Sequence, residues 1–234
     1  YNVLFVYTEN EEIQQDEINH FVEYNVGGVI VTDALLSSKI VEKLHDNRIN
    51  VALFNRYHKD IACHSVSCNN IHAAREIGKY MYENGYREIV FISGKPNTST
   101  SRDRQKGFCE LLESKGINVH ILQGDYTYEK AFHLTKKMIK DGYHPEAIFG
   151  ANDITAIGAL DALKELNISV PDETIVIGFD DIKMSSWPSY QLSTWAQPIE
   201  DMVDRTIDLL LSYSSNVPQE VKLKGHLIHR ETTK

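Results

Sequence analysis

Eight polar or aromatic residues follow, or lie close behind, stretches of the sequence that read as buried strands. Because the carboxyl ends of parallel strands share one edge of a sheet, side chains placed there can converge on one ligand. Arginines, an aspartate and amides supply directed hydrogen bonds, and an aromatic ring covers an apolar face, which suits a small ligand with many hydroxyls or ring nitrogens. The candidate binding residues are Asn55, Arg56, Arg102, Arg104, Tyr126, Asn152, Asp180 and Gln197.

Each of these residues also has a simpler explanation. Asn152 or Asp153 can cap the helix expected after the apolar run at 147–150, because a short side-chain oxygen accepts a hydrogen bond from an unpaired amide of the first turn. The alternatives for the others are a solvated basic turn for Arg102 and Arg104, a capping turn for Asp180 with Asp181, and a rim position for Tyr126. The sequence alone leaves these alternatives open.

Motifs of known catalytic and metal sites are absent from the sequence. It contains no G-x-S-x-G, no H-E-x-x-H, no P-loop and no G-x-G-x-x-G. The ten histidines are scattered, and His226 and His229 lie in an expected strand where a spacing of three turns them to opposite faces. We therefore expect no enzyme activity, no bound metal ion and no cofactor.

The elements that must position these residues alternate between strands and helices. Strands are expected at 3–6, 29–31, 51–54, 89–92, 119–122, 147–150 and 175–178, with a strand or crossover at 64–67, an extended segment at 192–198 and a strand from 226. Helices are expected at 9–24, 37–45, 70–84, before Gly116, at 131–139, after Asn152, and at 199–211. This alternation predicts an α/β fold with parallel sheets covered by helices on both faces, and two similar runs of it suggest two lobes.

Length and composition limit the class of protein. The chain has 234 residues, 42% of them hydrophobic, and a formal net charge of −9, so we expect a soluble protein that binds polyanions poorly by itself. No apolar run approaches the roughly 20 residues of a membrane span. The three cysteines, Cys63, Cys68 and Cys109, lack metal or redox spacing and are expected to be buried or inert thiols. With no visible signal peptide, a cytoplasmic location is expected.

A set of short motifs in this order resembles the effector-binding core of the LacI/GalR family of bacterial transcription regulators. The run IGFDD at 177–181, AND at 151–153 and QP at 197–198 carry most of the resemblance, because each motif alone is common and their joint occurrence is specific. Further matches are Gly27-Gly28-Val29-Ile30, Asn84-Gly85-Tyr86-Arg87-Glu88-Ile89, Arg104 followed by Gly107-Phe108, Val170-Pro171-Asp172 and Arg230-Glu231-Thr232-Thr233. The matches span nearly the whole chain.

The resemblance implies a two-lobed periplasmic-binding-protein-like fold, in which each lobe is a parallel sheet flanked by helices. The chain would cross between lobes three times, near Ser67, Gln197 and Lys224. The lobes would then comprise residues 1–67 with 197–224, and residues 68–196 with 225–234. A small metabolite, usually a sugar, sugar phosphate or nucleobase and here expected to be a sugar, would bind between them.

The resemblance also assigns roles to the candidate residues, position by position. Arg104 matches the arginine that holds ligand hydroxyls or a carboxylate, and Asp180 matches the aspartate that accepts hydrogen bonds from the ligand. The remaining assignments are an amide of the same cleft for Asn152, the aromatic wall for Tyr126, the polar strand end of the amino lobe for Asn55 with Arg56, and a crossing for Gln197. Asp153 is expected to cap its helix.

The chain departs from the family pattern at its amino end. The family's helix-turn-helix, and the first strand and helix of its core, have no counterpart here, so we expect a fragment of a longer protein. As a hypothesis, the ligand closes the lobes of a homodimer and changes how the missing DNA-binding domains meet operator half-sites. The alternatives are a periplasmic sugar-binding protein for transport and an enzyme on this scaffold.

Overall fold

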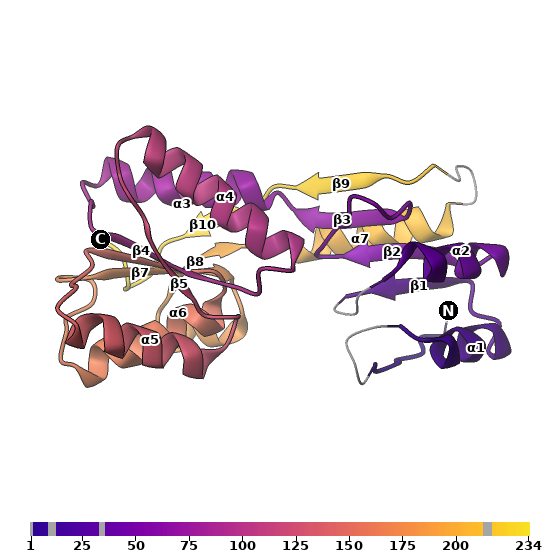
Figure 1. Ribbon diagram of the computed structural model, residues 1–234, viewed down its shortest axis with the longest axis horizontal. Helices are drawn as coiled ribbons and strands as arrows, with labels where there is room; N and C mark the ends of the chain where they lie inside the picture. Colours follow the sequence, from indigo (N-terminus) through magenta and orange to yellow (C-terminus); the bar gives the residue numbers. More distant parts are fainter. Residues whose placement is uncertain (1, 9–12, 33–35, 213–216) are drawn as a thin grey trace. The chain divides into compact units, whose positions relative to one another are not determined.

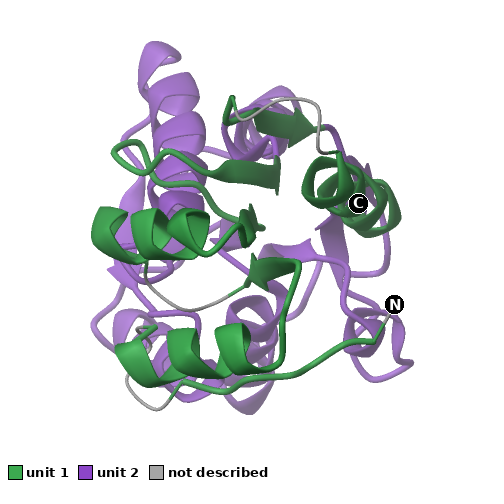
Figure 2. Ribbon diagram, turned by 90° about the vertical axis from the view of Figure 1, so that its right-hand side faces the viewer, with its two compact units in different colours: residues 1–67, 199–223 green, residues 68–198, 224–234 purple. Residues whose placement is uncertain are grey.

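The structure, a computed structural model, divides into two compact units and describes residues 2–8, 13–32, 36–212 and 217–234. Figure 2 colours the units: Tyr1–Ser67 with Ile199–Leu223 form unit 1, and Cys68–Pro198 with Lys224–Lys234 form unit 2. Gln197 and Lys224 thus belong to unit 2, whereas the resemblance assigned both to the amino lobe. For Gln197 the reason is local, because its side chain is hydrogen-bonded to Asp180 of unit 2.

Unit 1 is built on a four-stranded sheet with helices on both faces. The strand order is β1 (Gly28–Val31), β2 (Asn50–Phe54), β3 (His64–Cys68) and β9 (Glu220–Leu223), and β1–β2 and β2–β3 are parallel. Helices α1 (Gln15–Glu23) and α2 (Ser38–Asp46) supply side chains to one core cluster, and α7 (Ile199–Leu211) contacts β1 and β2.

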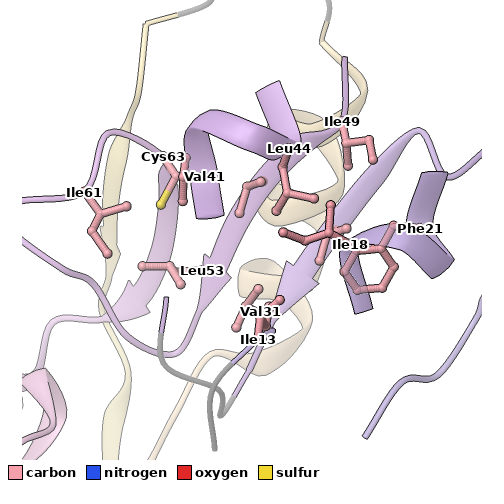
Figure 3. Packing of buried hydrophobic residues seen from close by; sticks show 12 residues of the cluster. Ile13, Ile18, Phe21, Val31, Val41, Leu44, Ile49, Leu53, Ile61 and Cys63 are labelled. Carbon is pink, nitrogen blue, oxygen red and sulfur yellow. The ribbon is translucent and has the colours of Figure 1, made fainter. Parts of the chain in front are cut away.

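The core of unit 1 follows from sequence periodicity. Alternate residues of a strand share a face, so Val29 and Val31 enter the cluster that also receives Leu44 of α2. Figure 3 shows Ile18 and Phe21 of α1, one helical turn apart, directed into the same cluster. Helix α2 begins where Ser37 accepts a hydrogen bond from the amide of Ile40, at 3.3 Å.

The predicted strand at 3–6 is wrong. Residues 2–8 form no strand, and the side chains of Val3 and Phe5 are 77% and 92% exposed. A segment becomes a strand only when its backbone groups pair with those of a neighbouring strand, and apolar composition does not reveal whether such a neighbour exists. None of the described strands pairs with residues 2–8. The helix predicted at 9–24 is observed as α1, and its predicted start at 9–12 lies outside the described residues.

Unit 2 is built on a six-stranded sheet between two pairs of helices. Its strand order is β10 (His226–Ile228), β8 (Ser193–Ala196), β7 (Ile175–Asp180), β6 (Ala147–Gly150), β4 (Ile89–Ser93) and β5 (His120–Gln123). Figure 1 shows α3 (Asn70–Glu83) beside α4 (Ser99–Ser114) on one face, and α5 (Tyr128–Lys140) beside α6 (Asp153–Glu165) on the other. A short 3₁₀ helix, η1 (Lys183–Ser186), follows β7.

The parallel α/β fold predicted from the sequence is confirmed, with two corrections at sheet edges. Strand β10 pairs antiparallel with β8, because the chain returns to unit 2 as a short edge strand and needs no crossover helix. Strand β9 was not predicted, because a charged residue at every second position of this short stretch is also typical of a solvated loop. Lys222 of β9 instead places its ammonium 4.5 Å from the ring centre of Tyr57.

Helix α6 is fixed to the sheet by a buried carboxylate. Asp153, its first residue, is 0% exposed and accepts hydrogen bonds from the amide of Ile182 at 2.8 Å, the hydroxyl of Ser185 at 2.6 Å and the hydroxyl of Thr194 at 2.5 Å. The carboxylate lies so close to β7 that a Cβ at Gly178 would be 2.2 Å from its Oδ1. The expectation that Asp153 caps the helix is wrong, because its oxygens bond to the β7 and β8 segments while Asn152 caps.

We predict that Asp153 makes the stability of unit 2 depend on pH. Burial raises the pKa of Asp153 to about 6, whereas an unfolded aspartate has a pKa of about 3.9. The folded state therefore retains the proton as the pH rises from 4 to 6, and stability falls over that window by an amount on the order of 3 kcal/mol. Asp153→Asn, which can keep all three hydrogen bonds, should lose this pH dependence in urea titrations.

The matched control is Asp172→Asn, because the side chain of Asp172 is 80% exposed. Urea midpoints of wild type and Asp172→Asn should fall in parallel between pH 4 and pH 6. If the urea midpoint of Asp153→Asn falls by the same amount over this range, Asp153 does not cause the loss of stability with rising pH.

Candidate ligand-binding site

The carboxyl ends of the parallel strands of unit 2 bring several polar residues to one edge of its sheet. Asp180 ends β7, Gln197 follows β8, and Ala151-Asn152 follow β6. Asn70 in the first turn of α3 and Arg104 in the second turn of α4 also lie at this edge. Their contacts with one another define the candidate site.

Arg104 is the centre of the site, and its side chain is only 3% exposed. Its Nε donates to Asn70 Oδ1 at 2.8 Å and its Nη1 to the carbonyl of Ala151 at 2.5 Å. Its Nη2 lies 3.5 Å from Asp180 Oδ1, and the guanidinium carbon lies 3.6 Å from the ring centre of Phe179. These contacts fix the planar guanidinium, and two of its five N–H groups donate to no residue that the structure describes.

Asp180 links Arg104 to the segment after β8. Its Oδ1 accepts from Gln197 Nε2 at 2.7 Å as well as from Arg104, and in the described part of the chain Oδ2 accepts no hydrogen bond. Gln197 Oε1 is buried and likewise has no partner among the described residues. The site therefore presents two oxygens that can accept a hydrogen bond, one buried on Gln197 and one on the partly exposed Asp180.

The environment of Asp180 is strained and partly desolvated. Its φ of 118° lies in a region that side chains other than glycine rarely adopt, and Asp181 follows with a φ of 57°. Burial raises the pKa of Asp180, and the adjacent guanidinium of Arg104 opposes this rise. Its side chain remains 26% exposed, so it can still meet a ligand.

Tyr126 lies over Gly94 and beside the first turn of α4, and its role as an aromatic wall for a ligand stays a prediction. Its backbone has a φ of 65°, and its ring covers Gly94 so closely that a Cβ at Gly94 would lie 2.0 Å from Tyr126 Cζ. Its hydroxyl is 3.1 Å from that of Thr100 in α4. Only glycine at position 94 allows the ring to lie there.

Two other predicted site residues of unit 2 have local explanations. Asn152 accepts from the amide of Thr155 at 2.9 Å and so caps α6, which was the simpler alternative. Arg102 is exposed and makes none of the contacts that hold Arg104, because residues two apart on a helix point in different directions. A ligand contact by either residue stays a prediction.

Asn55 and Arg56 follow β2 in unit 1. Asn55 has a φ of 61° and donates its amide to the carbonyl of Val66 at 2.8 Å, and its buried Oδ1 has no partner within the described ranges. Arg56 is half-buried. The part of these two residues in ligand binding stays a prediction.

The sequence did not reveal the role of Asn70. Two asparagines stand in a row at the start of α3, and the first of them, Asn69, caps the helix by accepting from the amide of His72 at 3.2 Å. Asn70 is buried, donates to the carbonyl of Cys68 at 3.0 Å and accepts from Arg104. The sequence held one signal of this role: only one residue can cap a helix, so the second of two consecutive asparagines must have another partner.

The three thiols are buried, and burial limits their reactivity. All three cysteines are free and buried, as predicted, and burial raises the pKa of Cys63 and Cys109 to about 11. Among the residues described, no three His, Cys, Asp or Glu side chains are grouped to hold a metal ion. In that same part of the chain, no helix is long and apolar enough to cross a membrane.

Sequence comparison relates the chain to bacterial regulators. Residues 79–233 match the model of the periplasmic binding protein-like domain. The chain is 25% identical over 242 residues to catabolite control protein A of Priestia megaterium, covering 100% of this chain and 73% of that protein. It is 30% identical over 161 residues to the HTH-type transcriptional repressor PurR of Salmonella paratyphi B, covering 66% of this chain and 47% of that repressor.

Solved structures give the same relationship. A regulatory protein of the LacI family from Chloroflexus aggregans superposes with a TM-score of 0.86 at 24% identity, covering 98% of this chain and 85% of that one. A sugar-binding LacI-family regulator from Escherichia coli, complexed with phosphate, superposes with a TM-score of 0.76 at 26% identity. The match covers 93% of this chain and 81% of that one. The regulator CelR in complex with cellobiose superposes with a TM-score of 0.79 at 21% identity, covering 94% of this chain and 71% of that one.

The arrangement of helices and strands, the match to residues 79–233 and these relatives agree with one another. The chain therefore belongs to the family of periplasmic binding protein-like domains, in the form found in LacI-family transcription regulators.

Proposed function

We propose that the strand-end site of unit 2 binds a small polyhydroxylated metabolite, with a sugar as the first choice. The observation that carries this proposal is the bonding of Asp180 to both Arg104 and Gln197, which leaves Asp180 Oδ2 and Gln197 Oε1 as acceptors. A sugar hydroxyl can donate to either oxygen and accept from a remaining N–H of Arg104. Tyr126 supports the proposal because a ring beside such donors and acceptors suits the apolar face of a sugar.

We further propose that binding regulates transcription. The relatives named as transcription regulators support this role over one in transport, and CelR is a related fold that binds cellobiose. A ligand that prefers one conformation of a homodimer would change how a DNA-binding domain, outside these 234 residues, meets operator DNA in the cytoplasm. Moving such an equilibrium from mostly one state to mostly the other requires a differential affinity of about 10⁴.

The first prediction from the proposed function concerns Asp180. In Asp180→Asn the side chain can keep its hydrogen bonds with Gln197 and Arg104 and lose its charge, so the fold should remain while sugar affinity falls at least about tenfold. Isothermal titration with cellobiose, D-ribose and D-xylulose measures the affinity, and thermal denaturation checks the fold. Asp172→Asn serves as the control, and an affinity unchanged by Asp180→Asn removes Asp180 from the site.

The second prediction concerns the wall formed by Tyr126. Gly94→Ala places a Cβ 2.0 Å from Tyr126 Cζ and must displace the ring, so affinity for the best sugar of the same panel should fall several-fold. In a Tyr126→Ala background the Gly94→Ala change should cost nothing more, because the displaced ring is gone. Gly27→Ala is the control, since nothing lies within 4 Å of its new Cβ. If Gly94→Ala lowers sugar affinity equally in the wild-type and Tyr126→Ala backgrounds, Tyr126 is not the wall of the site.

A further inference from the structure

The turn after β7 is held in an unfavourable backbone conformation at two successive residues. Asp180 and Asp181 have φ values of 118° and 57°, and neither is a glycine. Such conformations persist where the surrounding structure fixes them, and they occur preferentially at functional sites. The turn carries the Asp180 carboxylate, so whatever fixes the turn also aims that carboxylate.

Contacts at three residues, Asp180, Ile182 and Asp181, fix this turn from different directions. Asp180 is bonded to Arg104 and Gln197, and the amide of Ile182 donates to Asp153. The third contact comes from the end of the chain, where Arg230 Nη2 lies 2.6 Å from Asp181 Oδ1. The two side chains of this ion pair are 15% and 27% exposed, so the pair is partly shielded from water.

Arg230 is itself fixed before it reaches Asp181. Its Nη1 donates to the carbonyl of Leu192 at 2.7 Å, and its backbone amide donates to the hydroxyl of Ser193 at 2.8 Å. Two residues later, the hydroxyl of Thr232 donates to the carbonyl of Val176 in β7 at 2.7 Å. The guanidinium therefore stands in a frame made by β7, β8 and the end of the chain.

We propose that Arg230 is a positioning residue of the ligand site: through Asp181 it holds the turn that aims Asp180 at Arg104 and Gln197. This inference rests on the proposed function, because Asp180 is taken as the group that meets the ligand. Arg230 bonds to Asp181 and not to Asp180, so it acts through the turn. Loss of the Arg230–Asp181 pair frees the turn to relax toward a common backbone conformation and moves the carboxylate.

The first test follows the position of Asp180 without any ligand. Arg230→Gln should shift the backbone amide signals of Asp180 and Asp181 and the side-chain carboxyl signal of Asp180 in isotope-labelled protein. The matched control is Arg75→Gln, because Arg75 also contacts a carboxylate of unit 2, Glu110 at 3.0 Å, and that pair is 50% and 46% exposed. Unmoved Asp180 signals in Arg230→Gln, or equal movement in the control, overturn the proposal.

The second test uses sugar affinity and a double-mutant cycle. With the best sugar of the panel of cellobiose, D-ribose and D-xylulose, Arg230→Gln should weaken binding about tenfold in the wild-type background. In the Asp180→Asn background it should weaken binding no further, because Arg230 acts through that carboxylate. A residue that merely stabilises the fold leaves affinity unchanged, and one that acts elsewhere gives equal losses in both backgrounds; either result overturns the proposal.

The outcomes for the proposed function and for this inference can be separated. If no sugar of the panel binds the wild type, the choice of ligand class fails, and the signals of Asp180 still decide the role of Arg230. If Arg230→Gln does not fold, Asp181→Asn breaks the same ion pair from its more exposed side and takes its place in both tests. Arg230→Lys, which keeps the charge, should restore part of the affinity lost in Arg230→Gln.

Discussion

A buried guanidinium organises the strand-end region of unit 2. Removing a charge from water is costly unless hydrogen bonds and an opposite charge compensate for it. Arg104 finds that compensation on Asn70 of α3, the carbonyl after β6 and Asp180 of β7, with the ring of Phe179 beneath it. Because these partners come from three elements, one side chain sets the spacing between them, and a site built on them inherits that geometry.

Three carboxylates near the turn after β7 have different environments and therefore different roles. Asp153 has three neutral donors and no cation among its hydrogen-bond partners, so burial dominates and its pKa rises to about 6. Asp181 is paired with Arg230 and fixes the backbone. Asp180 shares one oxygen between Arg104 and Gln197 and keeps the other oxygen without a partner in the described chain. The residue left incompletely satisfied, Asp180, is the one that we propose meets a ligand.

The sequence predicted the parts of this arrangement that depend on local pattern. Alternating strands and helices place Asp180 and Gln197 at one sheet edge, and α7 was predicted with its observed bounds, Ile199–Leu211. The strand predicted at 3–6 was wrong, because a strand depends on a neighbouring strand that composition does not reveal. The ion pair between Arg230 and Asp181, 49 positions apart, could not be predicted because nothing local records such a contact.

The charges at the site argue for a neutral ligand. Arg104 and Asp180 compensate each other at 3.5 Å, and Asp153 adds negative charge above about pH 6. A phosphate or carboxylate placed on the free oxygen of Asp180 would face like charge, at a cost that the partly buried setting increases. A hydroxyl can donate to that same oxygen without any such cost. Under the proposed function, these charges favour uncharged polyols over their phosphorylated forms, and Arg104, already bonded on three sides, would orient the ligand more than attract it.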